Sequence, residues 1–422
     1  MTSPGSLIAA VRPIAGATIV ALLLSATMGC DSRSEVRGRI DHAWFRQNLI
    51  DAHLSRWLRA APTDNGFFRT AVDRSWTPKS AQPGDIVSHT RTLFVMAAGF
   101  EVTRDPAYLE QVRRGADFLL AHFHDAQYGG WFAAVAPDGK MINGNKRLYG
   151  QAFVIFGLAH AYRVTKDERY AQAAFATWRE INLRFADGLG GFRPAFTRDF
   201  ARSQQSHNSQ NPIMHLFEAL LALYDSTASP EILRDTRSLG DFVIYKLLQG
   251  DKEGGAYIPE LYDADWKPLP QDRGGHVDVG HQFEWAYMLS VAAQRGINPI
   301  YLGVSERLLK YALDHGYEHG VGGAFTSIRA DGKVDRHKGF WQQAEALRAL
   351  MHHAAVNGRG DLWGYVTQTL EIVRSEFLDE ENGGWYAVPR DECRKSAECL
   401  DTQPDGYHMT GMHLEALRIS AQ

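Results

Sequence analysis

The sequence predicts an all-α protein built as an (α/α)6 toroid, a closed ring of six helical hairpins with short β turns between the units. Two observations support this fold class. A glycine pair followed by an aromatic residue recurs along the chain, and segments apolar on nearly every face alternate with segments apolar on one side only. A fixed period indicates repeated units that cannot bury their apolar faces alone and must stack on their neighbours.

The glycine repeat sets the number of units. The copies are Gly129-Gly130-Trp131, Gly190-Gly191-Phe192, Gly254-Gly255-Ala256-Tyr257, Gly322-Gly323-Ala324-Phe325 and Gly383-Gly384-Trp385. Their second glycines are separated by 61, 64, 68 and 61 residues, and Gly66-Phe67-Phe68 lies 64 residues before the first copy. Six near-equal units predict a ring, and residues at the same offset in each unit are then expected to converge in space.

The first complete unit shows the order of its elements. Residues 93–102 are apolar on nearly every face, which is typical of a helix buried on both sides. Residues 104–106 end this helix, and residues 108–123 carry an apolar stripe on one side, which predicts an outer helix. The glycine turn at 129–131 and a short extended segment at 132–135 complete the unit.

The remaining units repeat this order. Segments of the inner type begin near Tyr149, Met214, His281, Trp341 and Tyr407, and segments of the outer type follow near Tyr170, Ile232, Tyr301 and Leu362. The sixth unit ends after its first helix. Residues 44–58 are apolar at helical spacing, and we expect them to supply the missing outer helix and to close the ring.

The composition is that of a globular protein, with 45% hydrophobic and 22% charged residues. Because the period runs without a linker or a charge block, residues 41–422 are predicted to form a single catalytic domain. The net charge is −4, and no cluster of lysine and arginine interrupts the sequence. Nucleic acid is therefore excluded as an expected partner.

The N-terminus has the layout of an export signal. Arg12 precedes an apolar run at residues 14–24, and small residues then lead to Gly29-Cys30. We expect residues 1–29 to be a lipoprotein-type signal peptide, Cys30 to be lipidated, and residues 30–40 to be a tether. The predicted location is the periplasmic face of a bacterial membrane, and Asp31 favours the inner membrane. The membrane is expected as a partner only through this anchor.

Cysteine usage agrees with export. Besides Cys30, the chain has only Cys393 and Cys399. An even pair in an oxidising compartment can form a disulfide, here across a short loop. A zinc site is disfavoured because the pair lacks histidine or cysteine partners at zinc spacing.

Unusual polar residues gather at the start of each predicted inner helix. They are Arg91, Tyr149, Gln151, Asn211, His215, His281, Glu284, Trp341, Gln342, Glu345 and His408. Counted from the preceding glycine pair, His215 lies 24 residues on, His281 26 and His408 24. We therefore expect the three histidines to share one pocket, surrounded by helix N-termini whose partial positive charge favours a developing anion.

Simpler interpretations apply to several of these residues. A single histidine is more often structural than functional, and His352, His353 and His413 lack the matched offset. Glu-Ala-Leu recurs at Glu218, Glu345 and Glu415, which indicates a scaffold role for Glu218, whereas Glu284 escapes this repeat. No metal is expected, because no two of the three histidines share a helix at i,i+4 spacing.

Several motifs together resemble the N-acylglucosamine 2-epimerase superfamily. They are Tyr149-Gly150-Gln151-Ala152-Phe153, Asn211-Pro212-Ile213-Met214-His215, Gly280-His281-Gln282-Phe283-Glu284-Trp285, Trp341-Gln342-Gln343-Ala344-Glu345-Ala346 and Tyr407-His408. The resemblance implies a sugar epimerase or aldose-ketose isomerase without a cofactor. It implies that His281 and His408 are the acid/base pair, that His215 and Glu284 assist, and that Arg91 holds sugar hydroxyls. Tyr149, Gln151, Asn211, Trp341, Gln342 and Glu345 are expected to contact substrate.

The chemistry suits these residue types. Imidazole is a base poised near neutral pH, as proton abstraction next to an aldehyde requires. The resulting cis-enediolate needs donors such as Arg91 and the helix N-termini.

Substrate and reaction type stay open. The motif at 280–285 is similar to that of monosaccharide isomerases, and the segment at 338–343 is nearer to that of disaccharide epimerases. One alternative is a glycoside hydrolase or lyase on the same toroid, with Asp278 and Glu284 as its carboxylates. Another is a non-catalytic glycan-binding lipoprotein. A small sugar is the expected partner, and the chain is expected to be a monomer or a homodimer.

Overall fold

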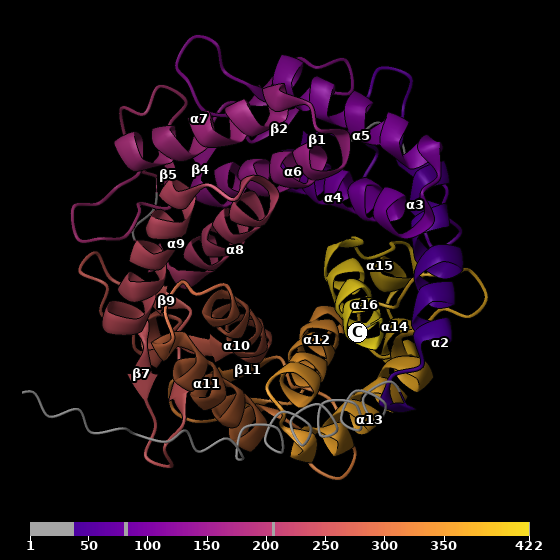
Figure 1. The fold of residues 1–422 in the computed structure, drawn as a ribbon, viewed down its shortest axis with the longest axis vertical. Coiled ribbons are helices and arrows are strands. Elements are labelled where there is room, and N and C mark those ends of the chain that lie inside the picture. Colours follow the sequence, from indigo (N-terminus) through magenta and orange to yellow (C-terminus); the bar gives the residue numbers. More distant parts are fainter. Residues whose placement is uncertain (1–37, 80–82, 205–206, 422) are drawn as a thin grey trace, which may run out of the picture.

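A computed structural model describes residues 38–79, 83–204 and 207–421. The predicted toroid is confirmed: Figure 1 shows an inner ring of helices around a central axis and an outer ring around it. The predicted signal peptide, Cys30 and Asp31 lie outside the described residues. In the described part of the chain, no helix is both long enough and apolar enough to span a membrane.

The inner helices are buried through most of their length. They are α4 (Ile86–Thr103), α6 (Leu148–Thr165), α8 (Gln210–Thr227), α10 (Val279–Gln294), α12 (Phe340–Val356) and α16 (Tyr407–Ser420). In α6, for example, every residue from Gly150 to Ala161 is buried. This is the reason for their apolar character on every face: one side packs on the outer ring and the others pack on neighbouring inner helices.

The outer helices bury one face only. They are α5 (Pro106–Phe118) with η2 (Leu119–Phe123), α7 (Glu168–Arg184), α9 (Pro230–Phe242) with η3 (Val243–Leu247), α11 (Ile300–Gly316), and α13 (Trp363–Ile372) with η6 (Val373–Phe377). Asp105 and Ser229 cap α5 and α9, and a proline follows each cap at the first helical position. The residues that precede these caps, Arg104 and Ala228, take left-handed backbone angles that end the inner helix sharply.

The N-terminal helices close the ring as predicted. The segment consists of α2 (His42–Gln47), η1 (Asn48–Leu54) and α3 (Ser55–Ala60), and it packs against α16 and α4. His413 Nε2 lies 3.0 Å from Asn48 Oδ1, and His53 Nε2 lies 3.2 Å from Thr410 Oγ1. Figure 1 shows this segment beside the end of the chain.

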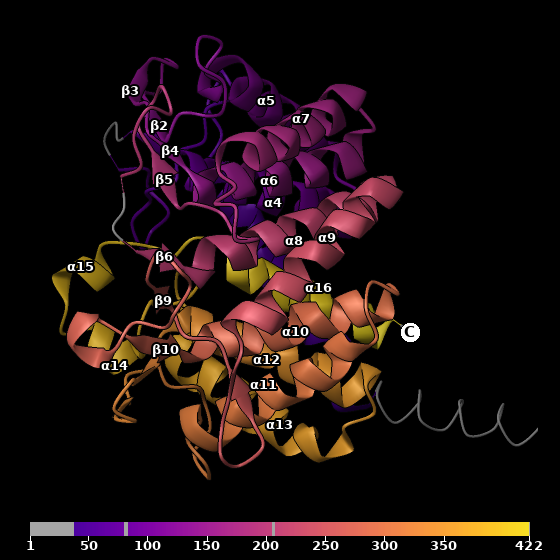
Figure 2. The same ribbon diagram turned by 90° about the vertical axis from the view of Figure 1, so that its left-hand side faces the viewer.

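Short antiparallel strands gather at one mouth of the toroid, on the left in Figure 2, with the C-terminus on the other side. One sheet joins β1 (Gly84–Asp85), β2 (Ala134–Val135) and β3 (Met141–Asn143), and another joins β10 (His276–Asp278), β11 (Ser327–Arg329) and β12 (Val334–Asp335). The pairs are β4 (Lys146–Arg147) with β5 (Ala195–Phe196), β6 (Asn208–Ser209) with β9 (Leu261–Tyr262), and β7 (Gln249–Gly250) with β8 (Ala256–Tyr257). Short helical turns are η4 (Gln271–Arg273), η5 (Gly360–Leu362), α14 (Arg390–Cys393) and α15 (Ala397–Leu400). Since the inner helices begin where these strands end, this front mouth holds their N-termini.

Glutamines on the inner helices tie the glycine turns to the ring. The side-chain amide of Gln151 accepts from the backbone N–H of Trp131 at 3.0 Å and donates to its carbonyl at 3.1 Å. Gln282 holds Ile258 and Gln343 holds Ala324 by the same pair of bonds. Both ends of the Gln151 amide are engaged by the backbone, which gives this residue a structural role. It also lines a cavity between the starts of α4, α6 and α8, so its contact with substrate stays a prediction.

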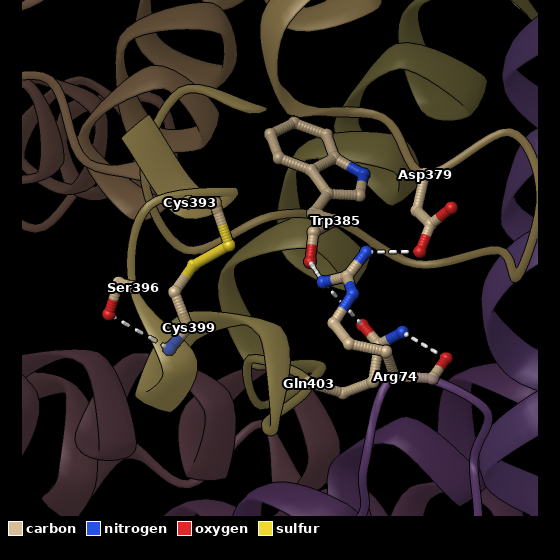
Figure 3. Close-up of a disulfide and its surroundings, with 7 residues drawn as sticks. All are labelled: Arg74, Asp379, Trp385, Cys393, Ser396, Cys399 and Gln403. Atoms are coloured by element: carbon tan, nitrogen blue, oxygen red, sulfur yellow. Dashed lines mark hydrogen bonds and ion pairs between the residues drawn. A yellow bond between two sulfur atoms is a disulfide. The ribbon is translucent and has the colours of Figure 1, made fainter. Parts of the chain in front are cut away.

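A disulfide joins Cys393 in α14 to Cys399 in α15, the pairing expected from the sequence (Figure 3). Next to it, Arg74 forms an ion pair with Asp379 and donates to the Trp385 carbonyl at 2.6 Å. Gln403 donates to the Arg74 carbonyl at 3.1 Å. These contacts anchor the segment that leads into α16 to residues near the start of the chain.

Candidate active site

Three histidines from three units meet at the front mouth. His215 lies in the second turn of α8, while His281 and His408 lie in the first turns of α10 and α16. Ligand atoms of His215, Glu218 and Glu284 all lie within 4.8 Å of one another, and so do those of Glu284, Glu345 and His408. Glu284 thus links two of the histidines. The Trp341 ring lies between His281 and His408, with its centroid 5.0 Å from the ring of His281 and 5.3 Å from that of His408.

Each histidine is held by a buried glutamate through the same ring nitrogen. Nδ1 lies 3.2 Å from Glu218 in His215, 2.8 Å from Glu260 in His281 and 2.8 Å from Glu345 in His408. A carboxylate accepts a hydrogen bond from the N–H at Nδ1, so the bond sets the orientation and tautomer of the ring. The Nε2 atoms are then the nitrogens available for proton transfer.

The surroundings shift the pKa values of His281 and His215 in opposite directions, so the two rings differ in charge at neutral pH. Burial alone lowers the pKa of His281, but the carboxylates of Glu260 and Asp278 outweigh it and raise the pKa to about 10. For His215, burial dominates and Glu218 offsets it only in part, so its pKa falls to about 4. His281 is therefore an imidazolium and His215 a neutral imidazole.

Glu284 is a buried carboxyl group whose two oxygens have no hydrogen-bond partner among the described residues. Burial raises its pKa well above the usual value, and the nearby carboxylates of Glu345 and Glu218 raise it further. The shift favours the protonated form of Glu284, which can donate a hydrogen bond. An unsatisfied buried group of this kind is costly unless a ligand completes it.

Arg91 places a fixed positive charge beside the histidines. Its guanidinium donates to Asp405 at 2.7 Å and to the Tyr149 hydroxyl at 2.9 Å. It also lies over the Phe153 and Tyr407 rings, at 4.6 and 4.5 Å from their centroids. Because these contacts hold it in one position, Arg91 can stabilise negative charge that develops on a bound molecule.

A cavity of about 340 Å³ lies between the starts of α4, α6 and α8, and Tyr149 and Asn211 line it, whereas none of the three histidines does. Tyr149 connects it to the cluster, since its ring centroid lies 5.1 Å from that of His215. Asn211 Oδ1 is buried without a hydrogen-bond partner among the described residues, so it can accept from a ligand hydroxyl. Gln342 is buried at the start of α12. Glu345 departs from its expected contact with substrate, because it is fully buried and bonded to His408.

Sequence reasoning missed Glu260, Gln210 and Asp405. Glu260 precedes β9, outside any inner helix, and no local motif marks it. Gln210 Nε2 donates to Glu260 at 2.7 Å and so helps to fix the carboxylate that holds His281. A signal for such carboxylates was present in the Glu-Ala-Leu repeat, whose members Glu218, Glu345 and Glu415 bond His215, His408 and His352.

Two residue groups in the described part of the chain offer enough ligand atoms for a metal ion. They are His215, Glu218 and Glu284, and Glu284, Glu345 and His408. Mixed histidine and carboxylate ligands suit several divalent transition metals. In both groups the histidine Nδ1 already bonds a glutamate, so a metal at that nitrogen would displace this bond.

A family model described as N-acylglucosamine 2-epimerase (GlcNAc 2-epimerase) matches residues 66–412. The chain is 28% identical to D-mannose isomerase from Pseudomonas cannabina pv. alisalensis, over 89% of this chain and 92% of that protein. It is 23% identical to cellobiose 2-epimerase from Bacteroides fragilis, over 81% and 89%. The solved structure of cellobiose 2-epimerase from Bacillus thermoamylovorans B4167 shares the fold, with a TM-score of 0.80, 20% identity, and coverage of 89% and 98%.

Proposed function

This chain belongs to the N-acylglucosamine 2-epimerase family and is a carbohydrate isomerase or epimerase, and from that premise we propose that it acts at the reducing end of a mono- or disaccharide by histidine-mediated proton transfer. The observation that carries the proposal is the convergence of three histidines, each held at Nδ1 by a buried glutamate. This arrangement suits a sugar 2-epimerase or a mannose isomerase, as the relatives are named.

In the proposed first step, His408 Nε2 takes the proton from C2 of the open-chain aldose. The electrons of the C2–H bond form a C1–C2 double bond, and the carbonyl pair moves onto O1 to give a cis-enediolate. Arg91 and the neutral Glu284 donate hydrogen bonds to the oxygens on which charge develops. Glu345 stabilises the imidazolium that forms on His408, as a carboxylate at Nδ1 does in other acid/base pairs.

The second step sets the product. If His281 gives its Nε2 proton to the opposite face of C2, the C1 carbonyl forms again and the product is the 2-epimer. If the proton on His408 returns to C1 while the O2 proton moves to O1, the product is the ketose. The positive charge of His281 at neutral pH suits the donor role.

Deuterium exchange tests the reaction. We expect mannose, cellobiose or mannobiose, incubated with the protein in heavy water, to lose the C2–H signal in proton NMR. His281→Ala and His408→Ala are expected to lower the exchange rate by about 10²–10⁴-fold, the usual contribution of one acid/base group. The exposed His319 is a control, since His319→Ala leaves the site intact. A folded protein that exchanges none of these sugars, or a fully active His408→Ala variant, would refute the proposal.

The hydrolase alternative requires Asp278 as a carboxylate free to act. In the structure Asp278 is the N-cap of α10 and accepts from the Gly280 N–H at 2.9 Å. A residue committed to a helix cap is poorly placed for glycosidic bond cleavage. New reducing ends released from an oligosaccharide in the same NMR assay would favour this alternative.

We also propose that the enzyme acts outside the cytoplasm, anchored by a lipid on Cys30. The sequence pattern before Cys30 supports export, and a disulfide such as Cys393–Cys399 is typical of oxidising compartments. We expect the full-length chain in the membrane fraction and Cys30→Ser in the soluble periplasmic fraction. An identical distribution of the two proteins would contradict the anchor.

A further inference from the structure

A second cavity lies at the opposite mouth of the toroid from the histidines. Its volume is about 480 Å³, within the roughly 300–1,000 Å³ typical of small-molecule sites. All six inner helices line it, mostly from their middles to their C-terminal ends, and α16 contributes from its first residue, Tyr407, onwards. We call it the rear cavity. It shares no lining residue with the cavity at the front mouth, and Glu218, which bonds His215, lies at its inner end.

Aromatic rings form part of the wall of the rear cavity. Phe94, Phe156, Tyr287 and Tyr407 contribute, together with His160. The His160 ring packs between Phe94 and Phe156, with centroids 4.6 and 4.5 Å away. Burial keeps the pKa of His160 well below its usual value, so the wall is uncharged there. Flat apolar faces beside a few placed polar groups suit a sugar or polyol ring.

The charged residues of the rear cavity cancel in pairs. Towards the helix C-termini, Arg163 bonds Glu101 at 2.6 and 2.7 Å. Arg418 bonds Glu415 at 2.6 and 2.8 Å, and Arg295 pairs with Asp225. The helix C-termini at this mouth add partial negative charge, which disfavours an anion. The cavity therefore suits a neutral ligand with hydroxyl groups.

Arg348 supplies a hydrogen-bond donor deep in the rear cavity. Its Nη1 lies 3.4 Å from Glu345 and 3.8 Å from Glu218, and its guanidinium stacks on Tyr287 at 4.1 Å. Its buried Nε has no hydrogen-bond partner among the described residues, nor has His160 Nδ1. Gly411 leaves room for the guanidinium, since an added Cβ would lie 3.2 Å from Nη1. Since Arg348 lines the cavity, a ligand hydroxyl can accept from its guanidinium.

From this combination we propose that the rear cavity is a second, non-catalytic binding site for a neutral monosaccharide or polyol. The rear cavity adjoins the histidine cluster on the side away from the front mouth. Glu218 lines the rear cavity while it bonds His215, and Tyr407, which donates to Glu218, lines it too. The inference depends on the shape and charge of the cavity and not on the reaction at the front mouth.

Fluorine NMR on a chain that cannot turn over sugar tests the proposal. In a His281→Ala background, titration with 2-deoxy-2-fluoro-D-glucose is expected to give two bound populations. Ala222→Trp on α8 and Leu414→Trp on α16 place an indole in the rear cavity from two different helices. Each is expected to remove one population. Leu183→Trp, on the exposed face of α7, is the matched control and should keep both.

Arg91→Ala in the same background separates this proposal from the proposed function, because it should remove only the front population. Thermal melting identifies a tryptophan variant that fails to fold, and the second one then carries the test. The proposal would be overturned if the His281→Ala chain showed a single bound population. It would also be overturned if the folded Ala222→Trp and Leu414→Trp variants kept both bound populations. Binding of inorganic phosphate at the rear cavity, lost in Ala222→Trp, would overturn the neutral class of ligand.

Discussion

Glu260→Gln tests whether a buried carboxylate keeps His281 protonated at neutral pH. The glutamate oxygen lies 2.8 Å from His281 Nδ1, and both side chains are buried. Glutamine keeps the size of the side chain and an oxygen that accepts from Nδ1–H, but it removes the negative charge. The substitution therefore isolates the electrostatic contribution from the geometric one.

The expected shift follows from the charge that is lost. The pKa of His281 lies at about 10 in the folded chain, against the usual 6.5. An opposite charge within a few ångströms raises a pKa by roughly 1–3 units, which corresponds to about 1.4–4 kcal/mol. With Asp278 still in place, we expect the pKa of His281 to fall to roughly 7–9. For a value near 8, the protonated fraction at pH 9 is about tenfold lower than in the parent chain.

A pH profile of C2–H exchange measures this change. In the parent chain we expect kcat/KM to decline on the alkaline side near pH 10, and in Glu260→Gln this limb should move down by 1–3 units while the rate near pH 6 changes little. A titration of the His281 ring by NMR gives the same pKa without turnover. Glu253→Gln, at an exposed residue of the same connecting segment, is the control.

The sign of the effect also appears in stability. Since the folded-state pKa of His281 is raised, its protonation stabilises the fold fully below pH 6.5, and this contribution is lost as the pH rises through about 10. Glu260→Gln should thus cost more stability at pH 7 than at pH 10. A folded variant whose alkaline limb and ring pKa match the parent would refute the role given to Glu260.

Three further predictions concern stability and metal dependence. Burial lowers the pKa of His53 and His89 to about 4 and that of His413 to about 3, and it also lowers the pKa values of His160, His215 and His352. Below pH 6.5 these rings bind fewer protons in the folded chain than in the unfolded chain, so the urea midpoint should be lower at pH 5 than at pH 7.5. Groups with raised pKa values act in the opposite direction but are fewer, and an unchanged midpoint would contradict the prediction; they are His281, His337, Asp278 and Glu284. Loss of the Cys393–Cys399 bond, by reduction or by serine at both positions, should lower the free energy of unfolding by about 2 kcal/mol for so short a loop, and equal melting temperatures would argue against it. Dialysis against a chelator should leave C2–H exchange unchanged if the histidines act alone, whereas a loss restored by manganese would assign metal binding to one of the two groups that contain Glu284.

Much of the fold was predictable because each unit repeats the same local physics. Alternation of helices apolar all round with helices apolar on one side follows from burial between two neighbours or against one. The positions of Tyr149 and His281 followed from the ring, since a fixed offset from the glycine turn places residues at one mouth. The roles of Gln151 and Glu345 did not follow. Their partners are the Trp131 backbone in a turn and the His408 ring in another unit, and neither is visible in local sequence.

The sequence by itself determined the toroid, the closure of the ring by residues 44–58, the pairing of Cys393 with Cys399 and the mouth at which His215, His281 and His408 converge. These features depend on period and local pattern. Only the tertiary structure decided which carboxylate holds each histidine and which rings are charged. Glu260 and Glu345 reach their histidines from other units, and a pKa depends on every charge and on all the burial around a group. The rear cavity, too, exists only once six helices have closed around an axis.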